Sequence, residues 1–267
     1  MALDSGEGFI RISGEVGTGK TMLCRTLLKG LRADEQAVYI PNPHLMPTML
    51  RVAVARELGV PADSRLDQDL LLARIQERLI ELAGQGKRVI VCLDEAQAMP
   101  DETLEALRLL TNLETERSKL LQVVLFGQPE LEAKLAKPEL RQVRQRIAWS
   151  YRLGPLTRDE VADYVAHRVR TAGCRGGAEH TLFSASALGG LDAASGGIPR
   201  LINVIGHKAL LVAYGRGGAQ VSAADVRAAA EDTDSAEPAA RSRGRWLYAA
   251  AVLALVVGLV ALWGGRP

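Results

Sequence analysis

The chain has 267 residues, of which 48% are hydrophobic and 24% charged, values typical of folded proteins that exclude a disordered or collagen-like chain. Its 33 basic and 31 acidic residues leave a net charge of +2, which argues against a protein whose main role is to coat nucleic acid. Aromatic residues make up only 4%, so a sheet that stacks RNA bases on aromatic rings is also disfavoured.

A strand, a glycine-rich loop and a helix are predicted near the start of the chain. Phe9–Ser13 alternates like a strand, and Met22–Leu31 has apolar residues at helical spacing. The residues between them, GEVGTGKT, fit the pattern G-x-x-x-x-G-K-S/T in full. Glycines let backbone N–H groups close around phosphates, and the helix N-terminus favours negative charge. The pattern therefore predicts a phosphate-binding loop for a nucleoside triphosphate.

Individual roles follow for this loop. Lys20 would contact the β- and γ-phosphate oxygens, and the Thr21 hydroxyl would ligate Mg²⁺. The predicted nucleotide-binding residues are Gly14, Glu15, Val16, Gly17, Thr18, Gly19, Lys20, Thr21 and Met22.

Three elements are expected before the next candidate site. Val38–Ile40 has the composition of a strand, and Pro47–Leu58 that of a helix that ends at Gly59. A longer helix is predicted over Leu66–Ala83, where five apolar residues would share one face: Leu70, Leu71, Ile75, Leu79 and Leu82.

An acid pair follows the next predicted strand. Val89–Leu93 is a continuous apolar run of the kind buried on both faces of a parallel sheet, and it ends in Asp94 and Glu95. An apolar strand with an acid pair at its carboxyl end is the Walker B arrangement. Asp94 would hold the Mg²⁺ shell, and Glu95 would orient and deprotonate the attacking water.

Further elements complete an α/β core. A helix is predicted over Asp101–Leu113, and strands over Leu121–Phe126 and Trp149–Leu153. Strands that alternate with helices predict a parallel sheet with helices on both faces. Residues 1–154 are therefore expected to form a nucleotide-binding core that ends near Gly154-Pro155.

Strand signals stop after this boundary, and residues 155–231 are expected to form a small all-helical lid. Thr157 and Glu160 have the spacing of a capping box for a helix through about Ala172, and Ser222 and Asp225 form a second box. The helices predicted after the first are Ser184–Ala194, Pro199–Tyr214 and Ser222–Ala230.

The last part of the chain differs in composition. Residues 232–245 are polar and are expected to form a juxtamembrane linker, while residues 246–263, WLYAAAVLALVVGLVALW, have no charge and are long enough to cross a bilayer. Trp246 and Trp263 lie at the ends of this run, and Arg241, Arg243 and Arg245 precede it. We expect a single-pass protein whose N-terminal part lies in the cytoplasm, with no signal peptide.

The remaining chemistry-bearing residues give no site. Cys24, Cys92 and Cys174 are odd in number and far apart, which favours buried, reduced thiols over a disulfide framework or a zinc ribbon. The four histidines lack metal-ligand spacing.

The phosphate loop, the Asp94-Glu95 strand and the helical lid together resemble an AAA+ ATPase with the P-loop NTPase fold. Five stretches resemble the branch that includes general secretion pathway protein A and the MSHA pilus biogenesis protein MshM: GEVGTGKT, LDEAQAMPDETLEALRLLTNLETE, LLQVVLFGQPEL, LRQVRQRI and GGIPRLIN. The resemblance covers about residues 8 to 230. Because relatives usually carry some forty residues before the first strand, the core is expected to be short at its N-terminus.

The resemblance implies further site residues. Gln128 is similar to sensor 1, a polar group near the γ-phosphate. Arg144 and Arg146 are candidates for an arginine finger that reaches a neighbouring subunit, with Arg146 preferred, and Arg141 is assigned to a surface or structural role. Arg200 is similar to sensor 2, which projects onto the nucleotide. Planar cations of this kind stabilise charge on the transferred phosphoryl group.

The function expected from this resemblance is Mg²⁺-dependent ATP hydrolysis by a homo-oligomer. It would be anchored in a bacterial inner membrane and support assembly of a type IV (MSHA-like) pilus or a type II secretion apparatus through a protein partner. Nucleic acid is not an expected partner. Two alternatives remain open: a DNA-binding ATPase of the transposition-regulator type, and a scaffold that binds nucleotide without hydrolysing it.

Overall fold

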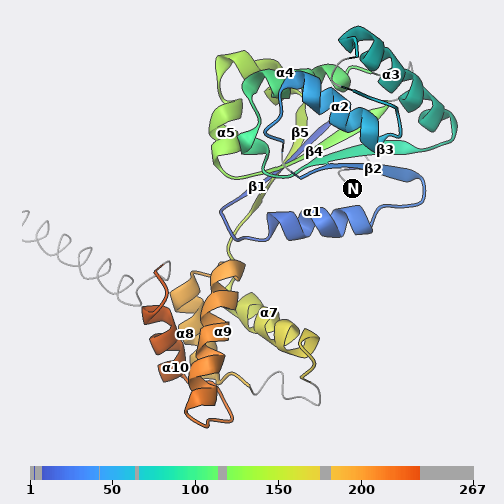
Figure 1. Cartoon of the computed structure of the whole chain (residues 1–267). Coiled ribbons are helices and arrows are strands. Elements are labelled where there is room, and N and C mark those ends of the chain that lie inside the picture. The colour runs from blue at the N-terminus through green and yellow to red at the C-terminus, as the bar shows by residue number, and fades with distance from the viewer. Residues whose placement is uncertain are drawn as a thin grey trace, which may run out of the picture. The chain divides into compact units, whose positions relative to one another are not determined.

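The computed structural model describes Leu3 and residues 8–41, 43–63, 66–113, 119–174 and 182–234. The chain forms two compact units, one that ends at Gly154 and one that begins at Pro155. In Figure 1 the first unit contains the sheet and the helices α1 to α5, and the second contains α7 to α10. We call the first the core and the second the helical unit.

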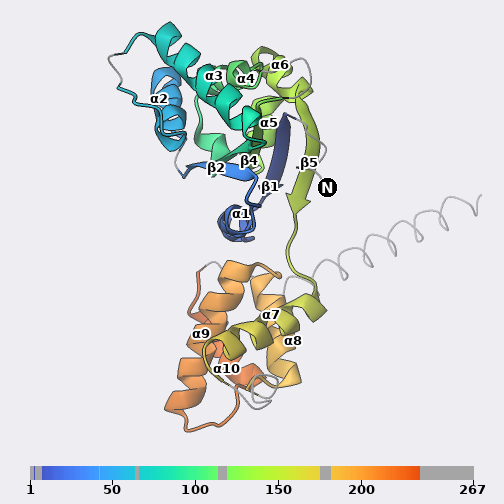
Figure 2. The ribbon, with the colours of Figure 1, turned by 90° about the vertical axis from the view of Figure 1, so that its right-hand side faces the viewer.

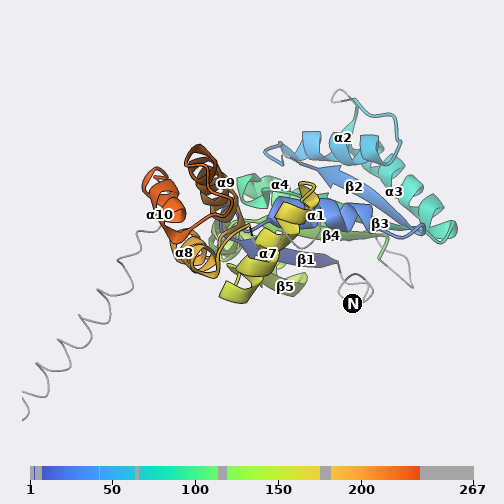
Figure 3. The ribbon, with the colours of Figure 1, turned by 90° about the horizontal axis from the view of Figure 1, so that it is seen from below.

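The core is built on one five-stranded sheet in which every neighbouring pair of strands is parallel. The strand order is β2-β3-β4-β1-β5, which can be followed across the sheet in Figure 3. The strands are β1 (Phe9–Gly14), β2 (Glu35–Ile40), β3 (Arg88–Leu93), β4 (Leu121–Gly127) and β5 (Ile147–Leu153). This order places β4 between β1 and β3, so the three carboxyl ends that follow these strands lie side by side.

Helices cover both faces of this sheet, as Figures 1 and 2 show, which confirms the predicted α/β architecture. On one face, α1 (Lys20–Lys29) packs Cys24 against Ile90, Cys92 and Phe126. The other face carries the larger apolar core. The remaining helical segments of the unit are α2 (Pro47–Glu57), α3 (Gln68–Gly84), η1 (Ala96–Ala98), α4 (Asp101–Leu110), α5 (Glu130–Leu135), η2 (Pro138–Leu140) and α6 (Arg141–Gln145).

The buried face of α3 differs from the predicted one. Leu71, Ile75, Leu79 and Leu82 are buried at steps of about one helical turn, but Leu70 is 46% exposed. One residue along a helix turns the side chain by about 100°, so Leu70 cannot share the direction of Leu71. The prediction that Leu70 faces the core was therefore wrong, and the outer face of α3 carries an exposed leucine.

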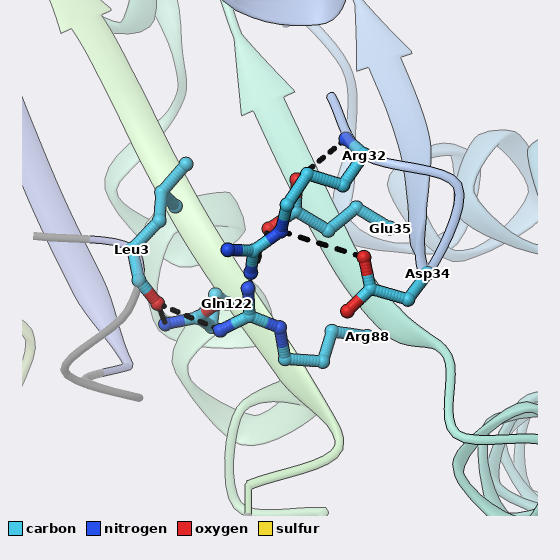
Figure 4. A network of polar contacts seen from close by, with 6 residues as sticks. All are labelled: Leu3, Arg32, Asp34, Glu35, Arg88 and Gln122. Carbon is cyan, nitrogen blue, oxygen red and sulfur yellow. Dashed lines mark hydrogen bonds and ion pairs between the residues drawn. The ribbon is translucent and has the colours of Figure 1, made fainter. Parts of the chain in front are cut away.

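A polar network ties together the amino ends of three neighbouring strands (Figure 4). The Glu35 carboxylate of β2, whose side chain is 5% exposed, pairs with Arg88 of β3 at 2.5 Å and with Arg32 at 2.9 Å. Arg88 and Gln122 of β4 both donate to the carbonyl of Leu3 at 3.1 Å. These contacts extend β2 to Glu35, three residues earlier than its apolar part predicted.

The helical unit contains α7 (Arg158–Thr171), α8 (Ala185–Ser195), α9 (Pro199–Gly215) and α10 (Ala223–Glu231). Both predicted capping boxes are confirmed, at Thr157 with Glu160 and at Ser222 with Asp225. The unit has its own apolar core, which includes Val161, Phe183, Leu191 and Ile205.

The other predictions have mixed outcomes. Helices α5 and α6 were not predicted, since each is a single short segment. Cys24 and Cys92 are buried free thiols, whereas Cys174 is partly exposed, contrary to the expectation that it is buried. Among the residues with described positions, no helix is long and apolar enough to cross a membrane. The predicted span 246–263 and most of the predicted linker lie outside those residues.

Candidate nucleotide-binding site

The loop between β1 and α1 is held by its own hydrogen bonds. Gly17 and Gly19 have φ of 85° and 99°, a left-handed conformation that glycine adopts without a steric penalty. The Thr18 hydroxyl donates to the carbonyl of Glu15 at 2.8 Å. A Cβ at Gly14 would come within 2.9 Å of the Leu153 carbonyl, so the close approach of β1 and β5 also requires glycine there. The spacing of these glycines thus has a geometric reason.

Positive charge and backbone donors gather at the start of α1. Lys20 is its first residue, and its buried ammonium donates to the carbonyls of Gly14 and Glu15, both at 2.9 Å. Leu23 is the residue whose N–H bonds to the carbonyl of Gly19, at 2.9 Å. The N–H groups of Lys20, Thr21 and Met22 precede it and are those a helix leaves without helical acceptors. Such a helix N-terminus has the chemistry to bind an anion.

The acid pair follows β3 directly. Asp94 is 3% exposed, and its carboxylate accepts from the N–H of Glu95 at 3.0 Å. No Lys or Arg forms an ion pair with Asp94 among the described residues. A buried carboxylate needs a compensating partner, and carboxylate and hydroxyl oxygens are the ligands that Mg²⁺ takes in proteins. The chemistry of Asp94 therefore fits a magnesium ligand, and the hydroxyl of Thr21, the second residue of α1, is of the same ligand class.

Asp94 also acts on a neighbouring tyrosine. Tyr39 lies on β2, opposite Cys92 of β3 in the strand register. Burial raises the pKa of Tyr39, and the negative charge of Asp94 raises this pKa further.

Glu95 has a left-handed backbone conformation that is unusual for a residue with a side chain. Its φ of 54° and ψ of 39° are left-handed, and it is the one non-glycine residue with positive φ in the described part of the chain. Such a conformation is unfavourable for a residue with a Cβ and is found more often at functional sites. The turn directs the chain from β3 into η1.

Two glutamines hold the Glu95 carboxylate. Gln128, the residue after β4, donates from Nε2 to Oε2 of Glu95 at 3.0 Å, and Gln97 of η1 donates to the same oxygen at 2.5 Å. The Gln97 side-chain oxygen in turn accepts from the N–H of Gln128 at 3.0 Å. The structure thus brings together the two predicted residues Glu95 and Gln128.

Gln97 and Lys134 were missed by sequence reasoning. Lys134 of α5 donates to the carbonyls of Gln97 and Met99, which fixes the segment after the acid pair. A signal for Gln97 existed, because it follows Glu95 by two residues in the motif LDEAQ, but nothing in the sequence marked its partner. Lys134 had no signal, since α5 itself was not predicted.

The arginines predicted as arginine finger and sensor 2 are on segments other than the phosphate loop and the end of β3. Arg144 is exposed on α6, and Arg146, partly buried, immediately precedes β5. Ile147 pairs with Phe9 and Leu153 with Gly14, so Arg146 stands at the opposite end of β1 from the phosphate loop, about 17 Å along the strand. Arg200 is the second residue of α9 and is exposed in the helical unit.

The similarity of this chain to known proteins agrees with the fold and the loop described above. Residues 3–135 match the family model described as an AAA domain. General secretion pathway protein A of Aeromonas hydrophila is 42% identical over 265 residues, which are 98% of this chain and 47% of that protein. The chain belongs to the AAA ATPases. It spans about half the length of the curated relative that it matches.

Several solved structures share the fold at low sequence identity. The ORC2 protein of Aeropyrum pernix, in ADPNP–ADP complexes, has a TM-score of 0.62 and 20% identity, with 88% of this chain and 65% of that chain covered. Cdc6p of Pyrobaculum aerophilum has a TM-score of 0.64 and 24% identity, with 85% and 62% covered. At these identities the similarity establishes the fold alone.

Proposed function

We propose that the chain is a membrane-anchored ATPase that hydrolyses ATP with Mg²⁺ and supports the assembly of a secretion apparatus or a pilus. The single observation that carries the hydrolytic part is the hydrogen bond from Gln128 to Glu95 beside the phosphate loop. A carboxylate that is held in place at the carboxyl edge of the sheet, the edge at which the phosphate loop and the start of α1 also lie, is suited to activate a water molecule close to bound phosphate.

Each residue of the site has a role in this proposal. Lys20 and the N–H groups of Thr21 and Met22 bind the phosphates, and the loop glycines let the backbone approach them. Asp94 and Thr21 would hold Mg²⁺, which neutralises phosphate charge when it is bound. Glu95 accepts the proton of the attacking water, and Gln128 keeps the carboxylate oriented. Arg200 would contact the nucleotide from the helical unit.

The placement of the arginine-finger candidates supports the proposed homo-oligomer. Arg146 and Arg144 lie at the amino end of β5, whereas the phosphate loop follows the carboxyl end of β1. A side chain of about 6–7 Å cannot bridge the length of a strand, so these arginines would contact the phosphates of a second copy. The active form would be a homo-oligomer.

The membrane and the partner are inferred from the apolar C-terminal run and from the curated relative. Residues 246–263 would anchor the chain in the inner membrane, with the ATPase in the cytoplasm. The name of the Aeromonas relative supports a secretion-type protein partner. Removal of residues 246–263 should move the protein from the membrane fraction to the soluble fraction of cells, and retention in the membrane would contradict the anchor.

The test of hydrolysis uses the full chain in detergent with Lys20→Ala and Glu95→Gln. Lys20→Ala should lose ATP binding, while Glu95→Gln should bind ATP and release phosphate at a rate lower by a factor on the order of 10² to 10⁴. Unchanged turnover in both variants would overturn the proposal. Nucleotide binding without phosphate release by the unmodified chain would favour the non-hydrolysing scaffold instead.

A further inference from the structure

The helical unit contains a cavity of about 400 Å³ between α7 and α9. Val165 and Val169 of α7 and Ile202 of α9 form its apolar walls with Phe183. The hydroxyl of Tyr164 accepts a hydrogen bond from Asn203 at 2.8 Å and links the two helices beside it. We call this cavity the α7–α9 groove. Its volume lies in the range of protein pockets that receive a ligand or an anchoring side chain.

One lining residue of the groove, on α9, is a glycine. Gly206 is buried inside α9 and lines the groove. A Cβ at this position would meet its nearest neighbours, the side chains of Leu191 and Phe183, at 3.9 Å, which is ordinary contact. Alanine would therefore fit and would favour the helix more than glycine does. Packing within the unit does not require a glycine here, whereas an occupant of the groove would gain space from it.

The rim of the groove is basic. Arg168 of α7 and His207 of α9 are exposed lining residues, and no Asp or Glu lines the groove in the described part of the chain. Neither side chain makes a hydrogen bond or an ion pair to any residue whose position the structure describes. Apolar walls with basic groups at the rim, which no described residue pairs, fit an apolar side chain that has a carboxylate near it.

A face with the complementary chemistry is present on the core. The outer side of α3 exposes Leu70 at 46% and Ile80 at 48%, together with the exposed carboxylates of Glu77 and Glu81. Glu77 and Ile80 are three residues apart and therefore neighbours on the helix surface. Glu81 is paired with Arg78 at 3.0 Å, but Glu77 has no ion-pair partner among the described residues.

We propose that α3 of one copy docks into the α7–α9 groove of a second copy. Ile80 enters the apolar cavity, and Glu77 pairs with Arg168 at the rim. Because α3 and the α7–α9 groove are different surfaces, each docked copy still has one of them free to bind a further copy. Contacts of this kind build a ring or a filament. This inference rests on the proposed homo-oligomer and names a contact that would build it.

Disulfide trapping between two different copies tests the contact. One copy is the unmodified chain, whose Cys174 lines the groove and is partly exposed while Cys24 and Cys92 are buried. The other carries Ile80→Cys with Cys174→Ser, so a mixed disulfide can form only between copies. After mild copper-catalysed oxidation of the mixture, we expect at least fivefold more mixed dimer than with Glu57→Cys and Cys174→Ser, which places the thiol on an exposed position of α2.

Charge and volume variants make the test specific. Arg168→Glu in the first copy should reduce the mixed dimer at least fivefold, and Glu77→Arg in the second should restore it. Arg170→Glu, also exposed on α7 but not lining the groove, should have no effect. If Arg168→Glu disturbs folding by circular dichroism, Gly206→Leu should fill the groove and block trapping, while Gly206→Ala should not.

Two results would overturn the docking contact: equal trapping at Glu57→Cys and Ile80→Cys, or no response to Gly206→Leu and to the exchange of charges. Trapping requires no ATP turnover, so its failure is distinct from a failure of the proposed hydrolysis. Phosphate release without specific trapping contradicts the contact alone, and specific trapping without phosphate release contradicts the ATPase alone.

Discussion

Gln128 and Glu95 come from two neighbouring strands, β4 and β3, and meet in a hydrogen bond of 3.0 Å between Nε2 and Oε2. The bond joins the residue expected to lie near the γ-phosphate with the residue expected to activate water. The orientation of the Glu95 carboxylate therefore depends on the side chain of Gln128, and the backbone N–H of Gln128 is in turn bound by the side-chain oxygen of Gln97.

Replacement of Gln128 should therefore reduce turnover more than binding. We expect Gln128→Ala to lower kcat for ATP hydrolysis by a factor on the order of 10 to 10², because Glu95 loses an orienting donor, with the affinity for ATP nearly unchanged. Steady-state phosphate release and a fluorescent-nucleotide titration would measure the two effects. Gln145→Ala, an exposed glutamine on α6, is the matched control. An equal loss in both variants would contradict the role.

An arginine finger that acts between copies predicts recovery of activity on mixing. Arg146→Ala and Glu95→Gln should each hydrolyse ATP poorly alone. In a mixture, sites that combine the intact Glu95 of one copy with the intact Arg146 of another should recover up to about a quarter of the wild-type rate. Arg141→Ala, on the same segment, should behave as wild type. No recovery at any mixing ratio would argue that Arg146 does not act in this way.

Loss of Arg88 should destabilise the core. Its removal leaves the Glu35 carboxylate, whose side chain is 5% exposed, with Arg32 as its remaining ion-pair partner and frees the carbonyl of Leu3 from one donor. We expect Arg88→Met to lower the free energy of unfolding by about 2–3 kcal/mol, since it leaves a buried carboxylate with one fewer partner. The loss is smaller than for a fully buried pair because the Arg88 side chain is about one-third exposed. Asp34→Asn, which breaks an exposed contact to Arg32, should cost less than about 1 kcal/mol. Urea unfolding followed by circular dichroism would compare them.

Acid should weaken the start of α7. The backbone N–H of Thr157, and then its hydroxyl, donate to Glu160 and lower the pKa of that carboxyl below its ordinary value of 4.5. The folded state then holds this proton less tightly than the unfolded chain. The contribution of the Glu160 carboxylate to the stability of the fold is complete above its ordinary pKa and is lost as the pH falls through the lowered pKa.

The variant Glu160→Gln removes that titration. Thermal unfolding of the full chain between pH 2 and pH 7 should show a smaller loss of stability on acidification for this variant than for wild type. Asp159→Asn, at the neighbouring exposed position, controls for the change in net charge. Identical pH profiles for Glu160→Gln and wild type would show that the capping carboxylate does not titrate as described.

Local patterns in the sequence were sufficient to predict the strands of the sheet, the phosphate loop after β1 and the acid pair after β3. Residues 9–13 alternate and are followed by glycine, residues 89–93 are an apolar run followed by an acid pair, and these combinations have few structural alternatives. Leu70 was misassigned because the prediction counted apolar residues without applying the turn of about 100° per residue, which separates Leu70 from the buried row that begins at Leu71. The pairing of Gln128 with Glu95 depends on strand order, and strand order is set by contacts between segments more than thirty residues apart.

The left-handed backbone of Glu95 has a consequence for the evolution of this protein. Glycine would adopt the same φ of 54° with less strain, which offsets part of the loss of the hydrogen bonds from Gln97 and Gln128, so Glu95→Gly should be tolerated by the fold while it abolishes the proposed reaction. Selection for stability alone would then not maintain the acid. Persistence of an acid at this turn would be a trade-off between durability and turnover.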